Sequence, residues 1–326
     1  MRIAITGANE FLGSFLCKYF HAEGHEIIAV GKQKYPPPDL NFSTYQQVDL
    51  LNPIPVFDAD ACIHAATYHS ETAAYPELFL YHVEGTLNVV EAARNCAHLV
   101  FISSSSVYEF GTQPVKETDA KIEAKLSDYG ETKLLAEEVL SYEIPAGQNR
   151  LILRPRIIYG IGDTFFLPKL FNLLKDGTIF SPVDKNVKTS LTHIENIAYA
   201  INLFFKQQEA ETLQIYNVTD EFAYLLADTI RELLSAIEDH PLKVVNVPFK
   251  PLSAIDKLYS KLHFLKKLNP AIIDAIHQNS VLDLDCIQKG LHYHPGRNFQ
   301  NSVSEIAGWI KSLGGKKAYL QQLSPS

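Results

Sequence analysis

The sequence lacks any uninterrupted apolar run that approaches the roughly 20 residues of a membrane-spanning helix. It also lacks the marks of a secretory signal, because residues 1–7 run directly into a predicted strand without a long apolar stretch or a cleavage site of small residues. We therefore expect no association with a membrane and a location in the cytoplasm.

Cysteine is scarce, and no two cysteines have the Cys-x-x-Cys spacing of a metal or redox motif. The four cysteines are Cys17, Cys62, Cys96 and Cys286. Such scattered residues argue against a disulfide framework and indicate buried free thiols. His292 and His294 could provide two metal ligands, but no third ligand stands nearby in the sequence, so we expect no metal.

Positive charge is in the minority, with 29 Lys and Arg against 37 Asp and Glu and a formal net charge of −8. A protein that binds nucleic acid needs an electropositive surface, so this balance argues against a nucleic-acid partner. Apolar residues make up 46% of the 326 residues, which argues against disorder. The length allows one large domain or two unequal ones.

Short apolar runs alternate with longer helical patterns over the first half of the chain. The runs lie at residues 3–5, 27–30, 61–65, 99–102 and 151–153, and the helical stretches at 12–22, 86–94 and 128–141. Near-continuous apolar runs are typical of strands that are buried on both faces. Their alternation with helices predicts an α/β fold with a doubly wound parallel sheet, the Rossmann arrangement.

The alternation loosens after residue 160, where polar and proline-containing stretches separate helical segments. Two such segments are predicted at residues 252–268 and 302–313, and the second opens with a capping box from Ser302 to Glu305. We expect a sheet domain over residues 1–160, to which part of 188–220 returns, and a smaller helix-rich substrate domain over 161–326.

A glycine-containing turn lies between the first predicted strand and the first helix, in the segment from Thr6 to Gly13. Gly7 and Gly13 allow a tight turn and a close approach of the backbone to a pyrophosphate, and the following helix N-terminus offers free N–H groups. An ordinary strand-to-helix turn is the alternative. The position after the first strand favours a dinucleotide site, so residues 1–160 are the predicted cofactor domain.

Two further segments carry groups suited to acid–base chemistry. Tyr129 and Lys133 share one face of a predicted helix, where the cation is expected to lower the pKa of the phenol. The serines at 103–106 end an apolar strand at the sheet edge where α/β proteins bind ligands. Taken singly, each segment has an alternative explanation, either a solvated helix face or an ordinary strand exit.

Together these segments resemble the extended short-chain dehydrogenase/reductase superfamily, the NAD(P)-dependent epimerase/dehydratase group. The likeness rests on the glycine turn, on a Ser-Ser-x-x-Val-Tyr segment that ends at Tyr108, and on Tyr129-x-x-x-Lys133. Further matches follow in order along nearly the whole chain, at His64-Ala65-Ala66, Gly85 to Ala93, Arg154-Pro155 with Tyr159-Gly160, Leu191 to Ile197, Tyr216-Asn217-Val218 and Lys289 to Pro295.

The resemblance implies three catalytic residues: Ser104 polarises the reacting oxygen, Tyr129 moves the proton, and Lys133 supports Tyr129 and holds the nicotinamide ribose. The implied cofactor site consists of Gly7, Asn9, Phe11, Leu12, Gly13, Lys32, Asp49, Leu50, Ala65, Ala66, Tyr129, Lys133 and Pro155. The implied substrate contacts are His82, Ser105, Arg154 and Arg156.

Several positions depart from the pattern of the superfamily. Glu10 replaces the middle glycine of the turn, where a carboxylate would repel a pyrophosphate unless it points away. His82 replaces the active-site Asn and brings a group that titrates near neutral pH. Glu109 stands where a glycine is usual, so the shape of that loop differs. Ser105 and Ser106 replace the Asp-Glu pair of sugar 4,6-dehydratases, which argues against that elimination.

The choice between the two nicotinamide dinucleotides is made at the end of the second strand. Segment 30–34 has no acid to bind the ribose hydroxyls, whereas Lys32 suits a 2′-phosphate. This pattern favours NADP over NAD, with a lysine that only aids solubility as the alternative.

The expected reaction is hydride transfer between a nicotinamide and a secondary alcohol or ketone, first of all of a nucleotide sugar. Phe165, Phe166 and residues 250–268 are expected to shape the substrate pocket. The lysines of 250–268 could attract a diphosphate, although a solvated helix face explains them as well.

Two other functions stay open at this point. Residues 154–170 also resemble the 3β-hydroxysteroid dehydrogenase-like branch, which acts on apolar ketones or β-hydroxy acids. The other alternative is a regulator that binds nicotinamide and has weak catalysis or none. In each case the resemblance implies a homodimer, in which the helices that contain Thr86 and Tyr129 form a four-helix bundle.

Overall fold

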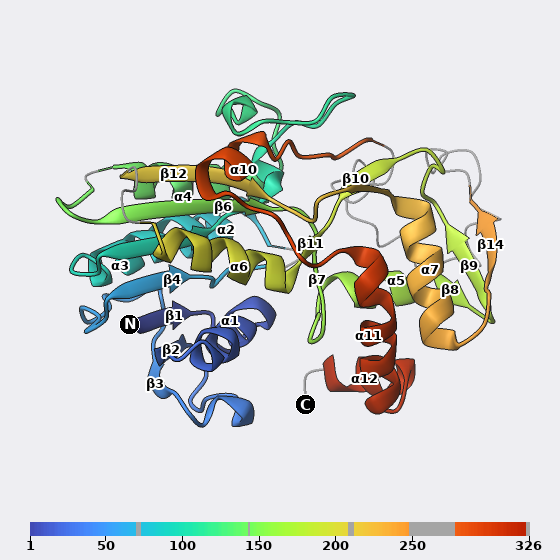
Figure 1. The fold of residues 1–326 in the computed structure, drawn as a ribbon, viewed down its shortest axis with the longest axis horizontal. Helices are drawn as coiled ribbons and strands as arrows, with labels where there is room; N and C mark the ends of the chain where they lie inside the picture. The colour runs from blue at the N-terminus through green and yellow to red at the C-terminus, as the bar shows by residue number, and fades with distance from the viewer. Residues whose placement is uncertain (70–72, 143, 208–211, 248–277, 324–326) are drawn as a thin grey trace.

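The computed structural model describes residues 1–69, 73–142, 144–207, 212–247 and 278–323 (Figure 1). The predicted helix at 252–268, with its lysines, lies outside these residues. None of the helices in the described part combines the length and the apolar character that crossing a bilayer requires.

A seven-stranded parallel sheet forms the larger part of the molecule, in the order β12-β6-β5-β4-β1-β2-β3. Its strands are β1 (Arg2–Thr6), β2 (Glu26–Gly31), β3 (Thr44–Gln47), β4 (Ala61–His64), β5 (His98–Ile102), β6 (Asn149–Pro155) and β12 (Leu213–Val218). The chain runs outward from β1 to β3 and then crosses back to β4. This reversal confirms the predicted doubly wound α/β fold and places a ligand-binding crevice at the carboxyl ends of β1 and β4.

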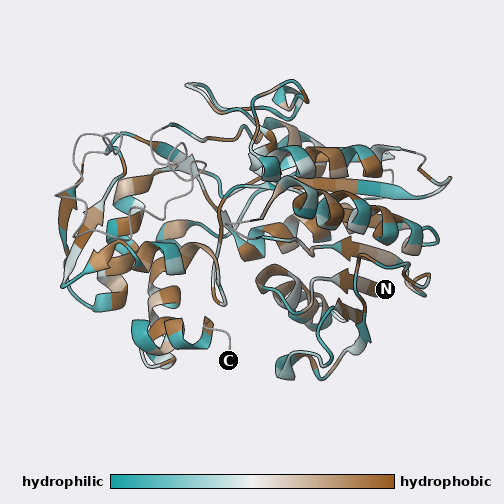
Figure 2. Cartoon of the chain, turned by 180° about the vertical axis from the view of Figure 1, so that it is seen from behind, coloured by the Kyte–Doolittle hydropathy of each residue, from teal (hydrophilic) through white to brown (hydrophobic). Residues whose placement is uncertain are grey.

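Alternate residues of each strand face opposite helical layers. Ile3 and Ile5 pack with α1 (Phe11–Ala22) and α6 (Ile194–Phe205), whereas Ala4 faces the layer of α3 (Gly85–Ala92) and α4 (Asp128–Ser141). Figure 2 shows the strands near the N-terminus coloured as hydrophobic between these layers. Burial on both faces explains why the strands appear in the sequence as continuous apolar runs.

Short helical segments lie between the strands and the longer helices. They are η1 (Pro38–Leu40), α2 (Tyr75–Phe79), η2 (Leu80–Glu84), η3 (Ser105–Val107) and η4 (Glu117–Asp119). The segments α2, η2 and α3 follow one another without a break, and η2 has π-type geometry. η2 and η3 both contact α4, so α4 lies against the segments that follow β4 and β5.

The C-terminal half builds a second core beside the sheet. Its elements are β7 (Ile158–Tyr159), α5 (Phe166–Phe171), β8 (Leu174–Lys175), β9 (Thr178–Ser181), β10 (Lys188–Ser190), β11 (Thr192–His193), β13 (Ala223–Leu225), α7 (Leu226–Glu238), β14 (Lys243–Asn246), α10 (Asp285–Leu291), α11 (Phe299–Ser312) and α12 (Lys316–Leu323). α5, α7, α11 and α12 share the second core, whereas β12 is the edge strand of the large sheet and α6 and α10 pack on that sheet (Figure 1). The exact domain boundaries stay a prediction.

The predicted start of the last long helix was wrong by one turn. α11 begins at Phe299, and the side chain of Asn298 accepts a hydrogen bond from the Asn301 backbone at 2.9 Å. Ser302 lies inside the helix and donates its hydroxyl to the Asn298 carbonyl at 2.8 Å. Asn caps a helix as well as Ser does, so local composition alone did not distinguish the two starts.

Candidate active site

The predicted site residues come together because they follow neighbouring parallel strands. Gly7 follows β1, Ala65 follows β4, Ser104 follows β5, and Pro155 ends β6. These strands are adjacent in the order β6-β5-β4-β1, so their carboxyl ends meet at one edge of the sheet. α4 brings Tyr129 to the segments after β4 and β5.

The turn after β1 has no room for side chains at its two glycines. Gly7 has a φ of 75°, and a Cβ there would lie 2.8 Å from the Ala66 Cα. A Cβ on Gly13 would lie 2.2 Å from the Gly7 carbonyl oxygen. α1 begins directly after this turn, and no side chain caps its first N–H groups. The turn therefore has the form of an anion-binding strand-to-helix connection.

Phe11 and Leu12 have different surroundings within this turn. Leu12 is buried in the core of the sheet domain. The Phe11 ring lies beside Gly162, since a Cβ at that glycine would stand 3.4 Å from the ring. The turn thus touches the loop after β7.

Glu10 points across to the segment after β4. Its carboxylate accepts a hydrogen bond from the Thr67 backbone at 3.2 Å, and its charge acts on Lys133 and Tyr129. The surrounding protein raises the pKa of the Glu10 carboxyl to about 7 by desolvation, although the residue as a whole is exposed. The carboxylate does not point away from the site.

The other end of the predicted cofactor site holds Asn9, Lys32 and Asp49. Lys32 pairs with Asp49 at 3.1 Å and donates to the Tyr81 hydroxyl at 3.1 Å. The Asn9 carbonyl oxygen accepts from the Tyr45 hydroxyl at 3.0 Å, while its amide nitrogen is buried without a partner. The structure therefore gives side-chain partners to three residues of the predicted cofactor site.

Leu50, Ala66 and Pro155 complete the positions assigned to the cofactor. The Leu50 carbonyl accepts from Asn88 at 2.8 Å, which ties the end of this loop to α3. Ala66 donates its backbone N–H to the Thr6 hydroxyl at 3.2 Å. Pro155 is buried at the end of β6, where it pairs with Val218.

Lys133 is fully enclosed on the inner face of α4. Its amine donates to the Ile102 carbonyl at 2.9 Å and lies 4.5 Å from the centre of the Phe101 ring. Burial lowers the pKa of Lys133 to about 8, against the opposing charges of Glu137 and Glu10.

Tyr129 does not have the lowered pKa that the sequence predicted. Burial raises it, the charge of Glu10 adds to the rise, and a bond to the Thr67 hydroxyl acts in the opposite direction. The Tyr129 and Thr67 oxygens are 3.4 Å apart. The expectation was wrong for this state because the Lys133 amine is bonded to a backbone carbonyl on β5, and desolvation dominates at the phenol.

Ser104 caps the short helix η3. Its hydroxyl accepts from the Ser106 backbone and bonds to the Ser106 hydroxyl, each at 3.1 Å. Ser105 is buried. Ser104 and Tyr129 need not bond to each other in the free enzyme in order to act on one substrate oxygen, because catalytic hydrogen bonds often tighten only when substrate binds.

His82 is a neutral imidazole whose two nitrogens both have protein partners. Nε2 lies 2.9 Å from the Tyr68 carbonyl oxygen, which can only accept, so Nε2 carries the proton. Nδ1 lies 2.9 Å from the Thr132 hydroxyl oxygen, and that hydroxyl also donates to the Asp128 carbonyl at 2.8 Å. Burial, with the charge of Lys133, lowers the pKa of His82 to about 3, so the expected titration near neutral pH was wrong. The ring stands edge-on to Tyr129, with 5.0 Å between centroids.

The two arginines after β6 have unlike environments. Arg154 is buried and pairs with Glu137 at 2.5 Å, and it also donates to the Tyr108 hydroxyl at 2.8 Å. A direct substrate contact by Arg154 would therefore require this pair to open, and its substrate role stays a prediction. Arg156 lies over the Phe110 ring at 4.7 Å.

Arg156 is a cation that has no matching carboxylate among the described residues. It donates to the Ser280 hydroxyl at 3.0 Å, but its Nε is buried without a hydrogen-bond partner. Desolvation alone lowers its pKa to about 10, with no acid of the described residues acting on it. A half-buried cation with a buried, unpartnered Nε is a candidate for binding an anionic group of a ligand.

Sequence reasoning missed the neighbours of Tyr129 on the segment after β4. Thr67 bonds to Tyr129, and the His69 ring stands edge-on to Tyr129 at 5.4 Å. His69 also contacts the predicted pocket residue Phe165, with centroids 3.9 Å apart, whereas Phe166 is buried in the second core. A polar residue directly after a strand end was the available signal for Thr67.

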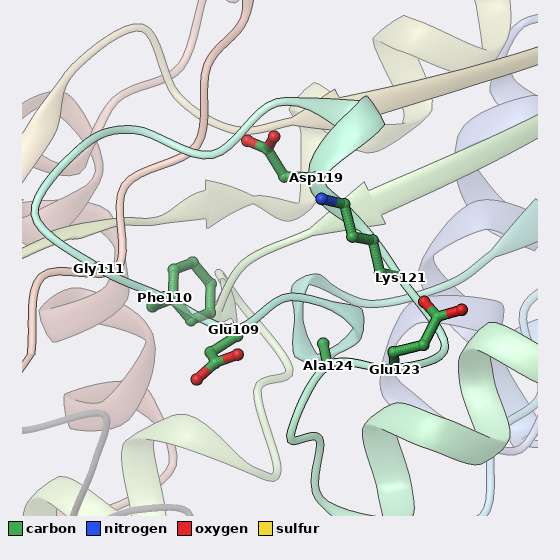
Figure 3. A pocket seen from close by; sticks show the side chains of 7 residues that line it. All are labelled: Glu109, Phe110, Gly111, Asp119, Lys121, Glu123 and Ala124. Carbon is green, nitrogen blue, oxygen red and sulfur yellow. The ribbon is translucent and has the colours of Figure 1, made fainter.

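A cleft of about 500 Å³ lies beside the loop after η3 (Figure 3). Its lining is Glu109, Phe110, Gly111, Asp119, Lys121, Glu123 and Ala124. It contains none of the predicted catalytic residues. Glu109 lines this cleft, so the loop carries a carboxylate at the position where a glycine is usual in the superfamily.

Comparison with known proteins identifies the family. A family model described as the NAD dependent epimerase/dehydratase family matches residues 3–219. The chain belongs to this family. It is therefore an enzyme of the epimerase/dehydratase group of oxidoreductases, as the motifs predicted.

The curated relatives include reductases and dehydrogenases. The chain is 31% identical over 218 residues to a 2-alkyl-3-oxoalkanoate reductase of Stenotrophomonas maltophilia, a match that covers 63% of this chain and 66% of that protein. It is 24% identical over 247 residues to a decarboxylating sterol-4-alpha-carboxylate 3-dehydrogenase of Schizosaccharomyces pombe, covering 71% and 72%.

Solved structures match the fold over almost the whole chain. The UDP-N-acetylglucosamine 4-epimerase from Bacillus cereus has a TM-score of 0.74 at 19% identity, covering 95% of this chain and 99% of that one. The UDP-glucuronic acid 4-epimerase from Bacillus cereus in complex with NAD has a TM-score of 0.74 at 18% identity, covering 96% and 99%. At this identity the likeness establishes the fold.

The residues present fit a nicotinamide dinucleotide. Gly7 and Gly13 allow the close backbone packing of the turn, where a Cβ would clash, and the buried Asn9 amide nitrogen still needs an acceptor. Lys32 and Asp49 offer both signs of charge at the adenosine end. The turn would hold the pyrophosphate, and Lys133 and Tyr129 would face the nicotinamide end.

Proposed function

We propose that the protein reduces the ketone of an apolar 3-oxo acid, or oxidises the corresponding β-hydroxy acid. The observation that carries this proposal is Arg156, a largely enclosed cation with no acidic partner among the described residues. Arg156 follows β6 and Ser104 follows β5, so both stand at one edge of the sheet on adjacent strands. One carboxylate would satisfy the free Nε of Arg156.

The groups around Tyr129 favour a substrate that is apolar apart from its carboxylate and its ketone. The rings of His69 and His82 stand edge-on to Tyr129, and Phe165 continues the aromatic surface beyond His69. Such side chains bind hydrocarbon by contact area and offer few groups for sugar hydroxyls. The 31% identical relative, which is named a 2-alkyl-3-oxoalkanoate reductase, agrees with this class.

Each catalytic residue has a separate part in the proposed reaction. The bound cofactor supplies or accepts the hydride. Ser104 donates a hydrogen bond to the reacting oxygen, and Tyr129 gives that oxygen its proton during reduction. Lys133 helps to hold the cofactor ribose and keeps a positive charge near the phenol when the phenol loses its proton.

Nucleotide-sugar chemistry is the second candidate. The solved structures that match 95–96% of the chain include epimerases of UDP-sugars, and Arg156 could bind a diphosphate as well as a carboxylate. At 18–19% identity this likeness does not select a substrate, so we place this candidate after the 3-oxo acid.

The decisive test is a substrate comparison at a fixed concentration of reduced cofactor. Medium-chain 3-oxo acids should be reduced, as followed by the loss of nicotinamide absorbance, while UDP-sugars should be neither oxidised nor epimerised. Arg156→Gln should raise the KM for the 3-oxo acid by about 10- to 100-fold, which corresponds to a lost charge-assisted hydrogen bond. The KM for the matching methyl ketone, which has no carboxylate, should stay unchanged.

The control for Arg156→Gln is Arg94→Gln, which removes an exposed arginine from a weak pair with Glu91. Turnover of UDP-sugars with no reduction of 3-oxo acids would contradict the proposal and support the second candidate.

For the cofactor we propose NADP over NAD. Lys32 supports this choice, because it stands at the end of β2 with its amine largely exposed. Its pairing with Asp49 reduces the net charge there, so the preference should be moderate. Lys32→Ala should lower the affinity for NADPH relative to NADH by about tenfold, the effect of losing one charge-assisted contact. The same ratio of NADPH affinity to NADH affinity in wild type and in Lys32→Ala would contradict this preference for NADP.

A further inference from the structure

Glu10 joins the two sides of the predicted cofactor site. One side is the turn over residues 7–13, and the other is the segment that contains Ala65, Ala66 and Thr67. Gly7 packs directly on Ala66, and Glu10 connects the sides again through its hydrogen bond to the Thr67 backbone at 3.2 Å. Residues assigned to the dinucleotide therefore stand on both sides of this bond.

The surroundings of Glu10 link it to the catalytic residues. The titratable groups of the described residues on which its charge acts are Lys133 and Tyr129, both on α4. The Thr67 hydroxyl lies 3.4 Å from the Tyr129 hydroxyl and 3.4 Å from His82 Nε2 on η2. The Glu10 carboxylate is therefore part of the active site in the free enzyme.

We propose that the ionised Glu10 carboxylate competes with the dinucleotide from within the chain, so that it takes up a proton or moves aside when the cofactor binds. A pyrophosphate at the turn and an ionised carboxylate beside it repel each other. Binding therefore favours an enzyme in which Glu10 is protonated or has moved aside. The inference concerns cofactor binding alone and does not depend on the proposed substrate.

The direction of the pH dependence follows from the protonation of Glu10. Desolvation raises the pKa of this carboxyl to about 7, while the Thr67 N–H and the charge of Lys133 act to lower it. Below this pKa the carboxyl is neutral and does not oppose the anion, whereas above it the carboxylate does. Affinity for the cofactor should fall as the pH rises through 7, and binding should take up protons.

Two neighbours of the Thr67 hydroxyl, His82 and Tyr129, have pKa values outside the range from about pH 5.5 to about 7.5. The pKa of His82 is lowered to about 3 and that of Lys133 to about 8, and that of Tyr129 is raised. Lys133 begins to lose its charge near the upper end of this range. The difference between wild type and Glu10→Gln over this range therefore isolates the contribution of Glu10.

The test is a titration of the substrate-free enzyme with NADPH and NADH, followed by nicotinamide fluorescence. For wild type, we expect the Kd to rise about fourfold from pH 5.5 to 7.5, the ratio for one group with a pKa near 7. Glu10→Gln should keep the low-pH Kd throughout this range, because it retains an acceptor for the Thr67 N–H without the charge. Glu10→Gly should bind at least as tightly as Glu10→Gln.

Glu138→Gln is the matched control, because it makes the same change at an exposed carboxylate of α4. It should keep the wild-type pH dependence. Calorimetry of NADPH binding in buffers of different ionisation enthalpy should show proton uptake near neutral pH for wild type and none for Glu10→Gln.

Three results would overturn the proposal. One is the same pH dependence in wild type and Glu10→Gln. Another is weaker binding by both Glu10→Gln and Glu10→Gly when thermal unfolding shows that they are folded. The third is the absence of dinucleotide binding in wild type and in both variants.

Discussion

Tyr129 lies in surroundings that keep its phenol protonated in the free enzyme. Burial and the charge of Glu10 both raise its pKa, and the Lys133 amine is bonded to the Ile102 carbonyl on β5. Reduction of a ketone requires a proton donor for the developing alkoxide. The resting protonation of Tyr129 therefore suits reduction better than oxidation.

Replacement of the phenol tests its proposed role. Tyr129→Phe should lower kcat by about 10²- to 10⁴-fold, the usual contribution of a positioned acid, without weakening NADPH binding. Steady-state kinetics and fluorescence titration measure the two effects. Tyr142→Phe, at an exposed position just after the same helix, should change neither. Full turnover by Tyr129→Phe would refute the acid–base assignment.

The motif residues could be named from the sequence, but their surroundings could not. Tyr129 and Lys133 have the correct spacing on one helix, and Ser104 lies at a strand end. Thr67 bonds to Glu10 and Tyr129, which are 57 and 62 positions away. Contacts at such separations depend on strand order, so neither the direction of Glu10 nor the bond to Thr67 was available from local pattern.

At the scale of elements, α4 and β6 are held together by one buried ion pair. Arg154 and Glu137 each have 4% of their side-chain surface exposed, and the Ser103 hydroxyl donates to the same carboxylate. Because the groups are desolvated, each depends on the other to balance its charge. The pair fixes the helix that carries Tyr129 against the strand that precedes Arg156.

Loss of the carboxylate should therefore destabilise the fold. Glu137→Gln leaves Arg154 buried without a counter-charge, which should lower the free energy of unfolding by about 3–5 kcal/mol. Glu138→Gln, the exposed neighbour, should change it by less than about 0.5 kcal/mol. Urea unfolding followed by circular dichroism measures both. An equal effect of the two changes would show that the ion pair contributes little.

The turn after β1 should not tolerate even a methyl group at Gly13. The Cβ of Gly13→Ala would meet the backbone carbonyl of Gly7, which has no freedom to rotate away. We expect a loss of about 1–3 kcal/mol in stability and weaker cofactor binding. Gly308→Ala, in open space within α11, should instead stabilise by about 0.4–1 kcal/mol. Chemical unfolding and NADPH titration compare the variants, and unchanged binding by Gly13→Ala would contradict the role of the turn.

Elements with strong periodicity were predictable, and weakly patterned ones were not. The helix predicted over 128–141 coincides with α4. The edge strand β3 is partly exposed and polar, with the sequence TYQQ, so it shows no apolar run. It joins the sheet through the backbone pairing of residues 44–47 with β2. Pairing of this kind leaves little trace in side-chain composition.

At the scale of the whole molecule, the outer face of α3 remains available for a second copy of the chain. Leu87 on α3 and Leu80 just before it are 44% and 49% exposed. The predicted homodimer would bury them in a bundle of α3 and α4 from both copies, at about 25 cal/mol per Å² of apolar surface. Dimerisation stays a prediction.

A charged side chain on the outer face of α3 should dissociate the predicted homodimer. Leu87→Glu should convert a dimer into a monomer at micromolar concentration, as measured by light scattering after size-exclusion chromatography. Leu225→Glu makes the same change at another exposed leucine, on β13, and should leave the dimer intact. Elution of the wild type as a monomer would contradict the bundle.

The sequence by itself determined the order of elements, the doubly wound sheet and the chemical groups at its carboxyl edge, because these depend on local periodicity and on motif spacing. Only the tertiary structure decided the states of those groups. It showed His82 neutral, Arg154 paired with Glu137, Arg156 without an acid among the described residues, and Glu10 directed toward Thr67. The reason is physical: a protonation state or an ion pair depends on desolvation and on partners from distant positions, and folding alone brings those partners together.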